Sequence, residues 1–361
     1  MTSVLVVDDS AVVRQVLCEE LSKAAGIQVV GSAVDPYVAR EKIISLKPDV
    51  VTLDLEMPRM GGLTFLGKLM KYYPLPVIVV SSLTPRGSEA ALRALELGAV
   101  DVIAKPGPGS SVGCIAQMLA EKIRAAAAAK DVALANRGLA APAVDTGPQW
   151  QAPRRYSREV LAIGASTGGT EAIKSILVGL PTDTPGTLIV QHMPAGFTEA
   201  FANRLNQLCQ MEVREARDND AVQPGVALIA PGDRHMTLRR TGESYSVRIK
   251  DGPSVHHQRP SVDVLFHSVA LQAGDRAVGA ILTGMGTDGA RGLLAMREAG
   301  ARTLAQDAES CVVFGMAREA IQMGAAQEVT SLSRMTHDIL DALADKTADA
   351  MCGIGRDETS R

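Results

Sequence analysis

Aromatic residues are scarce in this sequence, and the two signs of charge almost cancel. Phe, Tyr and Trp make up 3% of the 361 residues, so a site that stacks bases or encloses a cation in aromatic rings is not expected. The 37 Lys and Arg residues against 40 Asp and Glu residues give a net charge of −3. A dedicated nucleic-acid-binding protein needs a basic excess or a basic face, and we therefore expect no nucleic-acid partner.

Long hydrophobic runs, a signal peptide and paired cysteines are also missing. No apolar run approaches the roughly 18 residues that cross a bilayer, and the start MTSVLVVDDS has no basic region. The five cysteines never form a CxxC motif, which indicates a reducing compartment and neither a disulfide framework nor a zinc site. These absences predict a cytoplasmic protein without membrane insertion, and a hydrophobic content of 46% excludes wholesale disorder.

Within the first 124 residues, short β-branched segments alternate with helical patterns. Residues 11–24 and 87–97 repeat apolar side chains about every 3.6 residues, as helices that pack on one face do. Strands that alternate with helices predict βαβ units and a doubly wound, mostly parallel sheet. The predicted strands are residues 4–7, 29–33, 49–53, 77–80 and 100–104.

A second α/β unit follows a change in composition, and at roughly 150 residues per domain the length also predicts two domains. Residues 125–158 are rich in alanine with little periodicity and are predicted to be a linker, with an extension of the preceding helix as the alternative for their first part. Residues 159–348 resume the alternation and predict a second doubly wound, mostly parallel domain, followed by a polar tail at 349–361. Its predicted strands are residues 160–165, 188–191 and 277–283, with an added β-hairpin formed by 236–240 and 246–250.

Polar side chains follow the predicted strands of the first domain. Asp8 and Asp9 end the first strand, Asp54 the third, Ser81 the fourth and Lys105 the fifth. The carboxyl ends of parallel strands meet at one sheet edge, where three carboxylates would repel unless a cation joined them. Oxygen-only ligands favour Mg²⁺, and the lysine and hydroxyl could bind phosphoryl oxygens, so this edge is typical of carboxylate phosphorylation. The alternative for the first pair of aspartates is a helix N-cap.

A serine, a histidine and an aspartate follow predicted strands of the second domain. Ser166 lies in GASTGG, which fits the G-x-S-x-G pattern of a nucleophile on a sharp turn, and backbone N–H groups at the helix start could hold an oxyanion. His192 is the candidate base and Asp288 the candidate orienting acid. The order Ser, His, Asp differs from that of the α/β-hydrolases. The alternative is a phosphate-binding loop, although Asp183 lies before a strand and a Walker lysine is missing.

The other histidines carry weaker signals. His256 and His257 are adjacent on a loop rich in Arg, Pro and Asp, where a metal site is one interpretation and a solvated loop the favoured one. His235 and His267 are predicted to be structural, and His337 is predicted to lie on a helix surface.

The first domain resembles the flavodoxin-like receiver domain of response regulators. The resemblance rests on the spacing of Asp54, Met57-Pro58, Gly62, Ser81-Ser82 and Lys105-Pro106. It implies that Asp54 accepts the phosphoryl group, that Asp8 and Asp9 bind Mg²⁺ with it, that Ser81 is the switch hydroxyl and that Lys105 senses the phosphate.

The whole chain from about residue 1 to 345 resembles the CheB family of chemotaxis protein-glutamate methylesterases. The motifs that carry this resemblance are GASTGG, QHMP, IAPGDRHM, DGPSVHHQRPSVDVLF, LTGMGTDGA and AQDAESCVVFGMAREAI. It implies a Rossmann-like methylesterase domain, a catalytic triad of Ser166, His192 and Asp288, and Thr167 and Met285 beside the active site.

The same resemblance implies the function and the partners. The protein is expected to be a phosphorylation-activated esterase that releases methanol from glutamyl methyl esters of chemoreceptors and deamidates receptor glutamines, without a cofactor for the hydrolysis. A chemotaxis histidine kinase is the expected phosphodonor, the expected state is a monomer, and the unphosphorylated receiver is expected to cover the catalytic face. The alternative is a response regulator whose second domain binds a ligand or nucleic acid without catalysis, but no basic recognition helix supports it.

Overall fold

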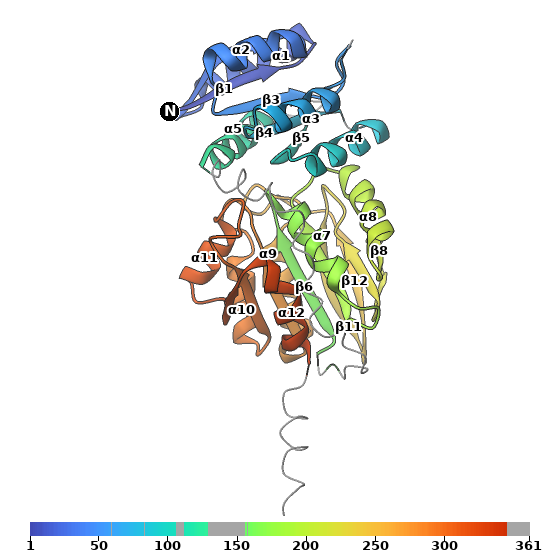
Figure 1. Ribbon diagram of the computed structural model, residues 1–361. Coiled ribbons are helices and arrows are strands. Elements are labelled where there is room, and N and C mark those ends of the chain that lie inside the picture. The colour runs from blue at the N-terminus through green and yellow to red at the C-terminus, as the bar shows by residue number, and fades with distance from the viewer. Residues whose placement is uncertain (59, 83, 106–111, 129–155, 157, 345–361) are drawn as a thin grey trace, which may run out of the picture.

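Two parallel sheets, each with helices on both faces, make up the protein in the computed structural model (Figure 1). The structure describes residues 1–361 except 59, 83, 106–111, 129–155, 157 and 345–361. None of the helices within the described residues is both long and apolar enough to cross a membrane. Both α/β domains predicted from the sequence are present. The predicted tail and most of the predicted linker lie outside the described residues.

The first domain has the strand order β2-β1-β3-β4-β5, which is the flavodoxin-like order. Buried side chains of α1 and α5 form one apolar cluster with the sheet, while those of α2, α3 and α4 lie in another. The elements are β1 Thr2–Val7, α1 Ala11–Lys23, β2 Ile27–Ala33, α2 Pro36–Leu46, β3 Val50–Asp54, α3 Gly62–Tyr72, β4 Val77–Ser81, α4 Pro85–Glu96, β5 Asp101–Ala104 and α5 Val112–Ala128.

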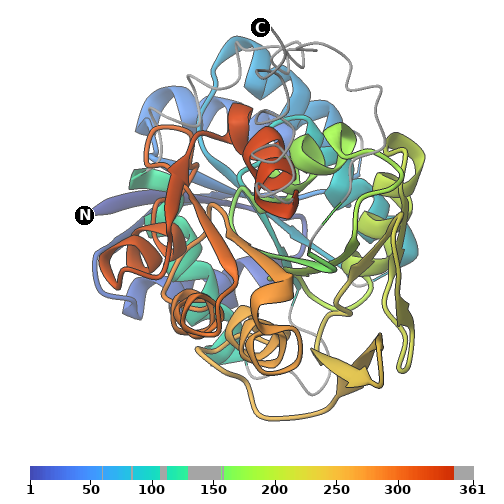
Figure 2. The same cartoon turned by 90° about the horizontal axis from the view of Figure 1, so that it is seen from below.

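The second domain has a seven-stranded parallel sheet in the order β15-β14-β13-β6-β7-β10-β8. Helices α7, α8 and α12 cover one face and α9, α10 and α11 the other, as Figure 2 shows from below. The elements are β6 Val160–Ala165, α7 Gly169–Gly179, β7 Gly186–Gln191, α8 Phe197–Leu208, β8 Glu212–Glu215, β10 Val226–Ile229, α9 Val262–Gln272, β13 Ala277–Ile281, α10 Ala290–Glu298, β14 Arg302–Gln306, α11 Met316–Gln322, β15 Glu328–Thr330 and α12 Leu332–Leu343.

The predicted hairpin is present and belongs to a separate antiparallel sheet. Strands β11 His235–Thr241 and β12 Ser244–Lys250 join through the two-residue turn at 242–243, and Gly242 takes a positive φ of 62° there. A third strand, β9 Ala221–Val222, pairs with β12 and was not predicted. Two residues are too few to show the alternation of apolar and polar side chains by which a strand is recognised.

The first domain extends beyond the predicted boundary at residue 124. Helix α5 continues to Ala128, so the alanine run that was assigned to the linker begins inside the helix. Alanine has the highest intrinsic helix propensity, which explains the continuation. Tyr156, within the predicted linker, forms a β-bridge with Ala344 and therefore lies against the second domain.

The first domain lies with α4 and α5 toward the second domain (Figure 1). Helix α4 packs against α8 and α7, and Arg204 on α8 forms a 2.7 Å ion pair with Glu96 on α4. Val312 of the second domain packs against the cluster that contains α5. These contacts place α5 beside the carboxyl edge of the second sheet.

Candidate active site

Ser166 lies directly after β6, in the middle of the seven-stranded sheet. From β6 the chain moves to one side through β7 and later to the other side through β13, and such a switch point is where open parallel sheets bind ligands. Gly168 then takes a φ of 77°, and a Cβ there would lie 2.6 Å from Val312. Only glycine allows this sharp turn, which leads into α7 three residues after the serine.

The strands that carry the three candidate residues are neighbours. β13, β6 and β7 are adjacent and in register, so Ser166, His192 and Asp288 emerge at one edge. The Ser166 N–H donates to Thr283 at 3.0 Å, and a Cβ on Gly284 would lie 2.7 Å from the Ser166 Cβ. The glycine-rich loop after β13 therefore packs directly against the serine.

His192 is 7% exposed and follows β7. Its Nε2 lies 2.8 Å from Asp288 Oδ2, and its backbone N–H donates to Ala165 at 3.1 Å. The other ring nitrogen, Nδ1, is buried and has no hydrogen-bond partner among the described residues. The imidazole is thus fixed on one side by a carboxylate, and its second nitrogen makes no hydrogen bond with Ser166 in this structure.

The Asp288 carboxylate accepts several further hydrogen bonds at the N-terminus of α9. Ser261 Oγ donates to it at 2.7 Å, the Val262 N–H at 2.7 Å and the Asp263 N–H at 3.1 Å. Burial raises the pKa of Asp288. The hydrogen bond and the charge of His192, together with the hydrogen bonds from Ser261 and Asp263, outweigh burial and lower this pKa below its usual value. The carboxylate is therefore held ionised next to the imidazole.

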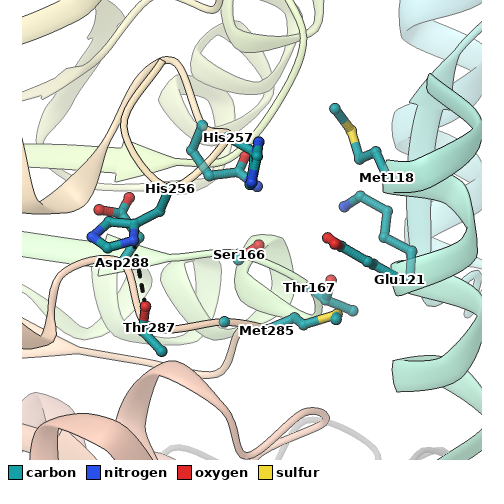
Figure 3. Close-up of a pocket in the computed structure, with 12 residues that line it drawn as sticks. Met118, Glu121, Ser166, Thr167, His256, His257, Met285, Thr287 and Asp288 are labelled. Atoms are coloured by element: carbon teal, nitrogen blue, oxygen red, sulfur yellow. Dashed lines mark hydrogen bonds between the residues drawn. The ribbon is translucent and has the colours of Figure 1, made fainter. Parts of the chain in front are cut away.

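A cavity of about 270 Å³ opens beside Ser166 (Figure 3). Thr167 and Met285, which the family resemblance places beside the active site, both line it. The first domain also contributes to its wall, through Met118 and Glu121 of α5, which lie opposite Ser166. The complete lining is Met118, Glu121, Lys122, Ser166, Thr167, His256, His257, Gln258, Met285, Gly286, Thr287 and Asp288.

His256 and His257 form the turn of a tight hairpin at the rim of this cavity. Both take positive φ values, 50° and 60°, and the hairpin closes through paired backbone hydrogen bonds between Val255 and Gln258. The prediction of a solvated loop does not describe His256 fully, because its imidazole contacts a carboxylate of the second domain: Nε2 lies 3.1 Å from Asp263 Oδ2. The oxygens of Asp288, the second acid near His256, are occupied by hydrogen bonds, which disfavours a metal there.

The acidic site at the edge of the first sheet has the predicted components. Carboxylate oxygens of Asp8, Asp9 and Asp54 lie within 4.8 Å of one another, which fits an oxygen-only ligand set for Mg²⁺. Lys105 Nζ lies 2.8 Å from Asp54 Oδ2 and 3.0 Å from Asp8 Oδ2. Burial and the neighbouring Asp54 charge raise the pKa of Asp8 despite Lys105, so this edge carries the like-charge repulsion that a cation would relieve.

Two details of this acidic site concern the helices around it. Ser10, rather than either aspartate, caps α1 by accepting from the Val13 N–H, so the capping alternative for the aspartate pair is wrong. Ser81, the predicted switch hydroxyl, is fully buried and donates at 3.2 Å to the backbone oxygen of Gly87 in α4. Its hydroxyl therefore bonds to α4 and not to Asp54.

Sequence reasoning missed the residues that hold the candidate triad and the residues of the first domain that approach it. Ser261 and Asp263 lie in the quoted DGPSVHHQRPSVDVLF motif, and the serine before an apolar run is an N-cap signal. Asp101 accepts a 2.5 Å hydrogen bond from Thr167 Oγ1 and forms an ion pair with Lys122. Contacts between domains leave no periodicity in the sequence, so no sequence pattern identified Asp101 and Lys122 as interface residues.

Comparisons with known proteins match both domains. The family model of the CheB methylesterase matches residues 161–339, and that of the response regulator receiver domain matches residues 4–112. A protein-glutamate methylesterase/protein-glutamine glutaminase of Syntrophus aciditrophicus is 58% identical over 93% of this chain and 98% of its own length. The Escherichia coli K12 protein of the same description is 56% identical over 93% of this chain and 95% of its own length.

A solved structure matches the second domain. The CheB methylesterase catalytic domain of Thermotoga maritima superposes with a TM-score of 0.50 at 34% identity and covers 51% of this chain and 98% of that one. The second domain here therefore has the same extent as a domain that was solved separately.

Asp8→Asn is expected to raise the melting temperature at pH 7 without divalent cations. An acid whose pKa is raised by folding favours the native state at low pH and loses that contribution as the pH rises through the folded pKa. The neutral amide removes the cost of burying a charged carboxylate beside Asp54. The gain in melting temperature over the wild-type chain should therefore shrink as the pH falls toward 4. Thermal unfolding by circular dichroism, with the exposed Asp9→Asn as control, measures it. A lower melting temperature than that of the wild-type chain at pH 7 would contradict the stated pKa direction.

Proposed function

The chain belongs to the CheB methylesterase family, and from this premise we propose that it hydrolyses glutamyl 5-O-methyl esters of chemoreceptors, releasing methanol, under control of its receiver domain. The observation that carries this proposal is the Ser166, His192 and Asp288 group at adjacent strand ends, with a buried His192–Asp288 hydrogen bond of 2.8 Å. A non-catalytic output domain has no need to bury such a pair next to a serine that lines a cavity.

Ser166 is the proposed nucleophile and His192 the proposed base. His192 takes the hydroxyl proton as Ser166 attacks the ester carbonyl, and then gives a proton to the leaving methoxide. Water, deprotonated by the same imidazole, releases glutamate from the acyl-enzyme. The unpartnered Nδ1 of His192 supports this role, because the other nitrogen is already engaged by Asp288.

Two features support stabilisation of the charged intermediates. Asp288 holds the imidazole in one tautomer and stabilises the imidazolium, and the lowered pKa of Asp288 keeps it ionised. Helix α7 begins at Gly169, so its N-terminal N–H groups lie near the carbonyl oxygen of a substrate acylating Ser166. Thr167 and Met285 line the same cavity and are proposed to position the acyl group.

Deamidation of receptor glutamines is the proposed second activity. A glutamine amide and a glutamyl methyl ester yield the same acyl-enzyme at Ser166, with ammonia or methanol leaving. The curated relatives carry both activities in their name, which supports assigning both to this chain.

Asp54 is the proposed phosphorylation site. Asp8, Asp9 and Asp54 are proposed to hold Mg²⁺, which would neutralise the charge of the phosphoryl group during transfer. Lys105, between Asp8 and Asp54, is placed to pair with a phosphoryl oxygen. The proposed donor is a chemotaxis histidine kinase, and the proposed setting is the cytoplasm, with the chain acting as a monomer on receptor helices.

Ser166→Ala is expected to reduce methanol release by roughly 10³-fold or more, because residues of a triad act as a unit. His192→Ala should be comparably severe. Asp288→Asn should lose nearly as much and also destabilise α9, since its amide group would face the donors Ser261 and Val262. Release of methanol from esterified receptor, with circular dichroism to verify folding, measures each loss. Wild-type rates in Ser166→Ala would exclude the triad.

Asp54 is expected to take phosphate from acetyl phosphate only when Mg²⁺ is present. Three carboxylates at one edge repel an anionic donor unless a cation neutralises them. Incorporation of labelled phosphate into the wild-type chain and into Asp54→Asn, each with and without a chelator, tests this. Equal labelling of the Asp54→Asn variant would exclude Asp54 as the acceptor. Labelling of the wild-type chain in the presence of the chelator would exclude the requirement for Mg²⁺.

Removal of residues 1–158 is expected to raise basal esterase activity. Residues 159–344 carry their own seven-stranded sheet, and α5 forms one wall of the cavity at Ser166, so deletion opens the site. Phosphorylation of Asp54 should act in the same direction in the full chain by favouring the open arrangement. Methanol release by the fragment and by the full chain, with and without a phosphodonor, decides this. A folded fragment no faster than the unphosphorylated chain would contradict occlusion.

A further inference from the structure

The glutamine before His192 has its side chain buried against the turn that carries Ser166. Gln191 is the last residue of β7 and is 2% exposed. Its side-chain nitrogen Nε2 lies 2.8 Å from the carbonyl oxygen of Ser166 and 3.4 Å from that of His192. A single amide group therefore donates to the backbone of both the candidate nucleophile and the candidate base.

The orientation of this amide follows from its neighbours. The two carbonyl oxygens that Nε2 contacts can only accept hydrogen bonds, so the nitrogen of the Gln191 side chain, and not its oxygen, must face them. The oxygen lies against the start of α7, since a Cβ on Gly169 would be 2.2 Å from Gln191 Oε1. The glycine that begins α7 thus makes room for the glutamine.

Burial of the Gln191 amide has a cost in stability that packing does not require. Its Oε1 is buried and accepts no hydrogen bond from any described residue. An unsatisfied buried acceptor destabilises a protein, and an apolar side chain of similar length would avoid that penalty. The Ser166 carbonyl does not depend on the glutamine for a partner, because the Gly169 N–H donates to it at 2.8 Å. Folding alone therefore does not explain an amide at this position.

The geometry of a trans peptide indicates what the amide does. In such a peptide the C=O of one residue and the N–H of the next point in opposite directions. Because Gln191 and Gly169 both donate to the Ser166 C=O, the N–H of the next residue points away from these two donors. That residue, Thr167, lines the cavity together with Ser166. Within the part of the chain that the structure describes, its N–H donates to no other group.

We propose, as an extension of the proposed function, that Gln191 is a positioning residue of the esterase. Its amide fixes the peptide group between Ser166 and Thr167, so that the Thr167 N–H is aimed at the carbonyl oxygen of an ester under attack. The N–H of the residue after the nucleophile is a donor that hydrolases with a serine on a sharp turn use for this purpose. The second bond, to the His192 carbonyl, ties the backbone of the base to the same amide.

This role predicts a loss in kcat and not in binding. Negative charge on the carbonyl oxygen develops only in the transition state, so a misdirected donor costs little in the ground state. A variant without the Gln191 amide should therefore have a lower kcat at an unchanged KM. A glutamine that only stabilised the fold would change the melting temperature and leave both kinetic constants of the folded enzyme unchanged.

The test measures methanol release from methyl-esterified receptor by the full chain, treated with acetyl phosphate and Mg²⁺. Gln191→Met has a side chain of similar length without a donor and should lower kcat by roughly 10- to 100-fold, since a displacement of about 1 Å in an active site can cost 10²-fold. Its melting temperature should stay close to that of the wild-type chain. The Ser166 carbonyl keeps its bond from Gly169, and the unsatisfied Oε1 is removed.

Gln191→Glu keeps the shape of the side chain and makes the donor depend on pH. A protonated carboxyl can donate to the Ser166 carbonyl, whereas an ionised carboxylate only accepts and would face two carbonyl oxygens. The kcat of this variant, divided by the wild-type kcat at the same pH, should rise as the pH falls. The ratio cancels the titration of groups common to both chains, including His192.

Gln272→Met is the matched control. Gln272 also bonds to the backbone, since its Oε1 accepts from the Arg240 N–H at 3.0 Å, and it is partly buried. It is the last residue of α9 and therefore lies at the end of that helix away from Ser261 and the candidate triad. Its replacement should leave kcat and KM unchanged.

Three results would overturn the inference: a wild-type kcat in Gln191→Met, a raised KM at unchanged kcat in that variant, or a kcat ratio for Gln191→Glu that does not change with pH. Should Gln191→Met fail to fold by circular dichroism, the ratio for Gln191→Glu decides alone. Failure of the proposed function looks different, because the wild-type chain itself then releases no methanol.

Discussion

The candidate active site depends on one buried carboxylate. Asp288 joins the loop after β13, the N-terminus of α9 and the imidazole of His192 through hydrogen bonds of 2.7 to 3.1 Å. Each of these donors would be costly to leave unsatisfied in the interior, so the carboxylate fixes the relative positions of three segments that are distant in sequence. Ser166 needs no such anchor, because the sheet and the glycine turn already place it.

A single strand connects the proposed phosphorylation site to the candidate active site. β5 begins at Asp101, which accepts the Thr167 hydroxyl across the domain interface, and Lys105, which pairs with Asp54, follows its other end. A phosphoryl group at Asp54 would compete for Lys105 and can thereby alter β5 at the end opposite the interface. Helix α4 provides a second connection, since Ser81 donates to it and it packs against α8 of the second domain. Both connections run through residues that lie outside the proposed triad.

The sequence predicted what lies at the ends of long, apolar strands, and it missed what depends on packing between segments. Ser166, His192 and Asp288 were predictable because parallel strands deliver their carboxyl ends to one edge. Asp101 and Glu121 were not, because a charged residue at a domain interface has the same local pattern as one on a solvated surface. The strands β8, β9, β10, β14 and β15 were also missed, since a period is hard to recognise in segments of two to five residues. The helix at 125–128 was assigned to the linker because an alanine run fits either state.

The interface between the domains combines an ion pair at its surface with a buried carboxylate that accepts a hydrogen bond across it. The Arg204–Glu96 pair is largely exposed and contributes at most about 1 kcal/mol. Asp101 is different, because it is buried between Lys122 and Thr167; when the domains part it keeps Lys122 and loses only the Thr167 hydroxyl. A shift from 1:99 to 99:1 between closed and open arrangements needs about 5.5 kcal/mol of differential affinity. An interface that leaves the Asp101–Lys122 pair intact on opening avoids stranding a buried charge, and this lowers the free-energy cost of opening.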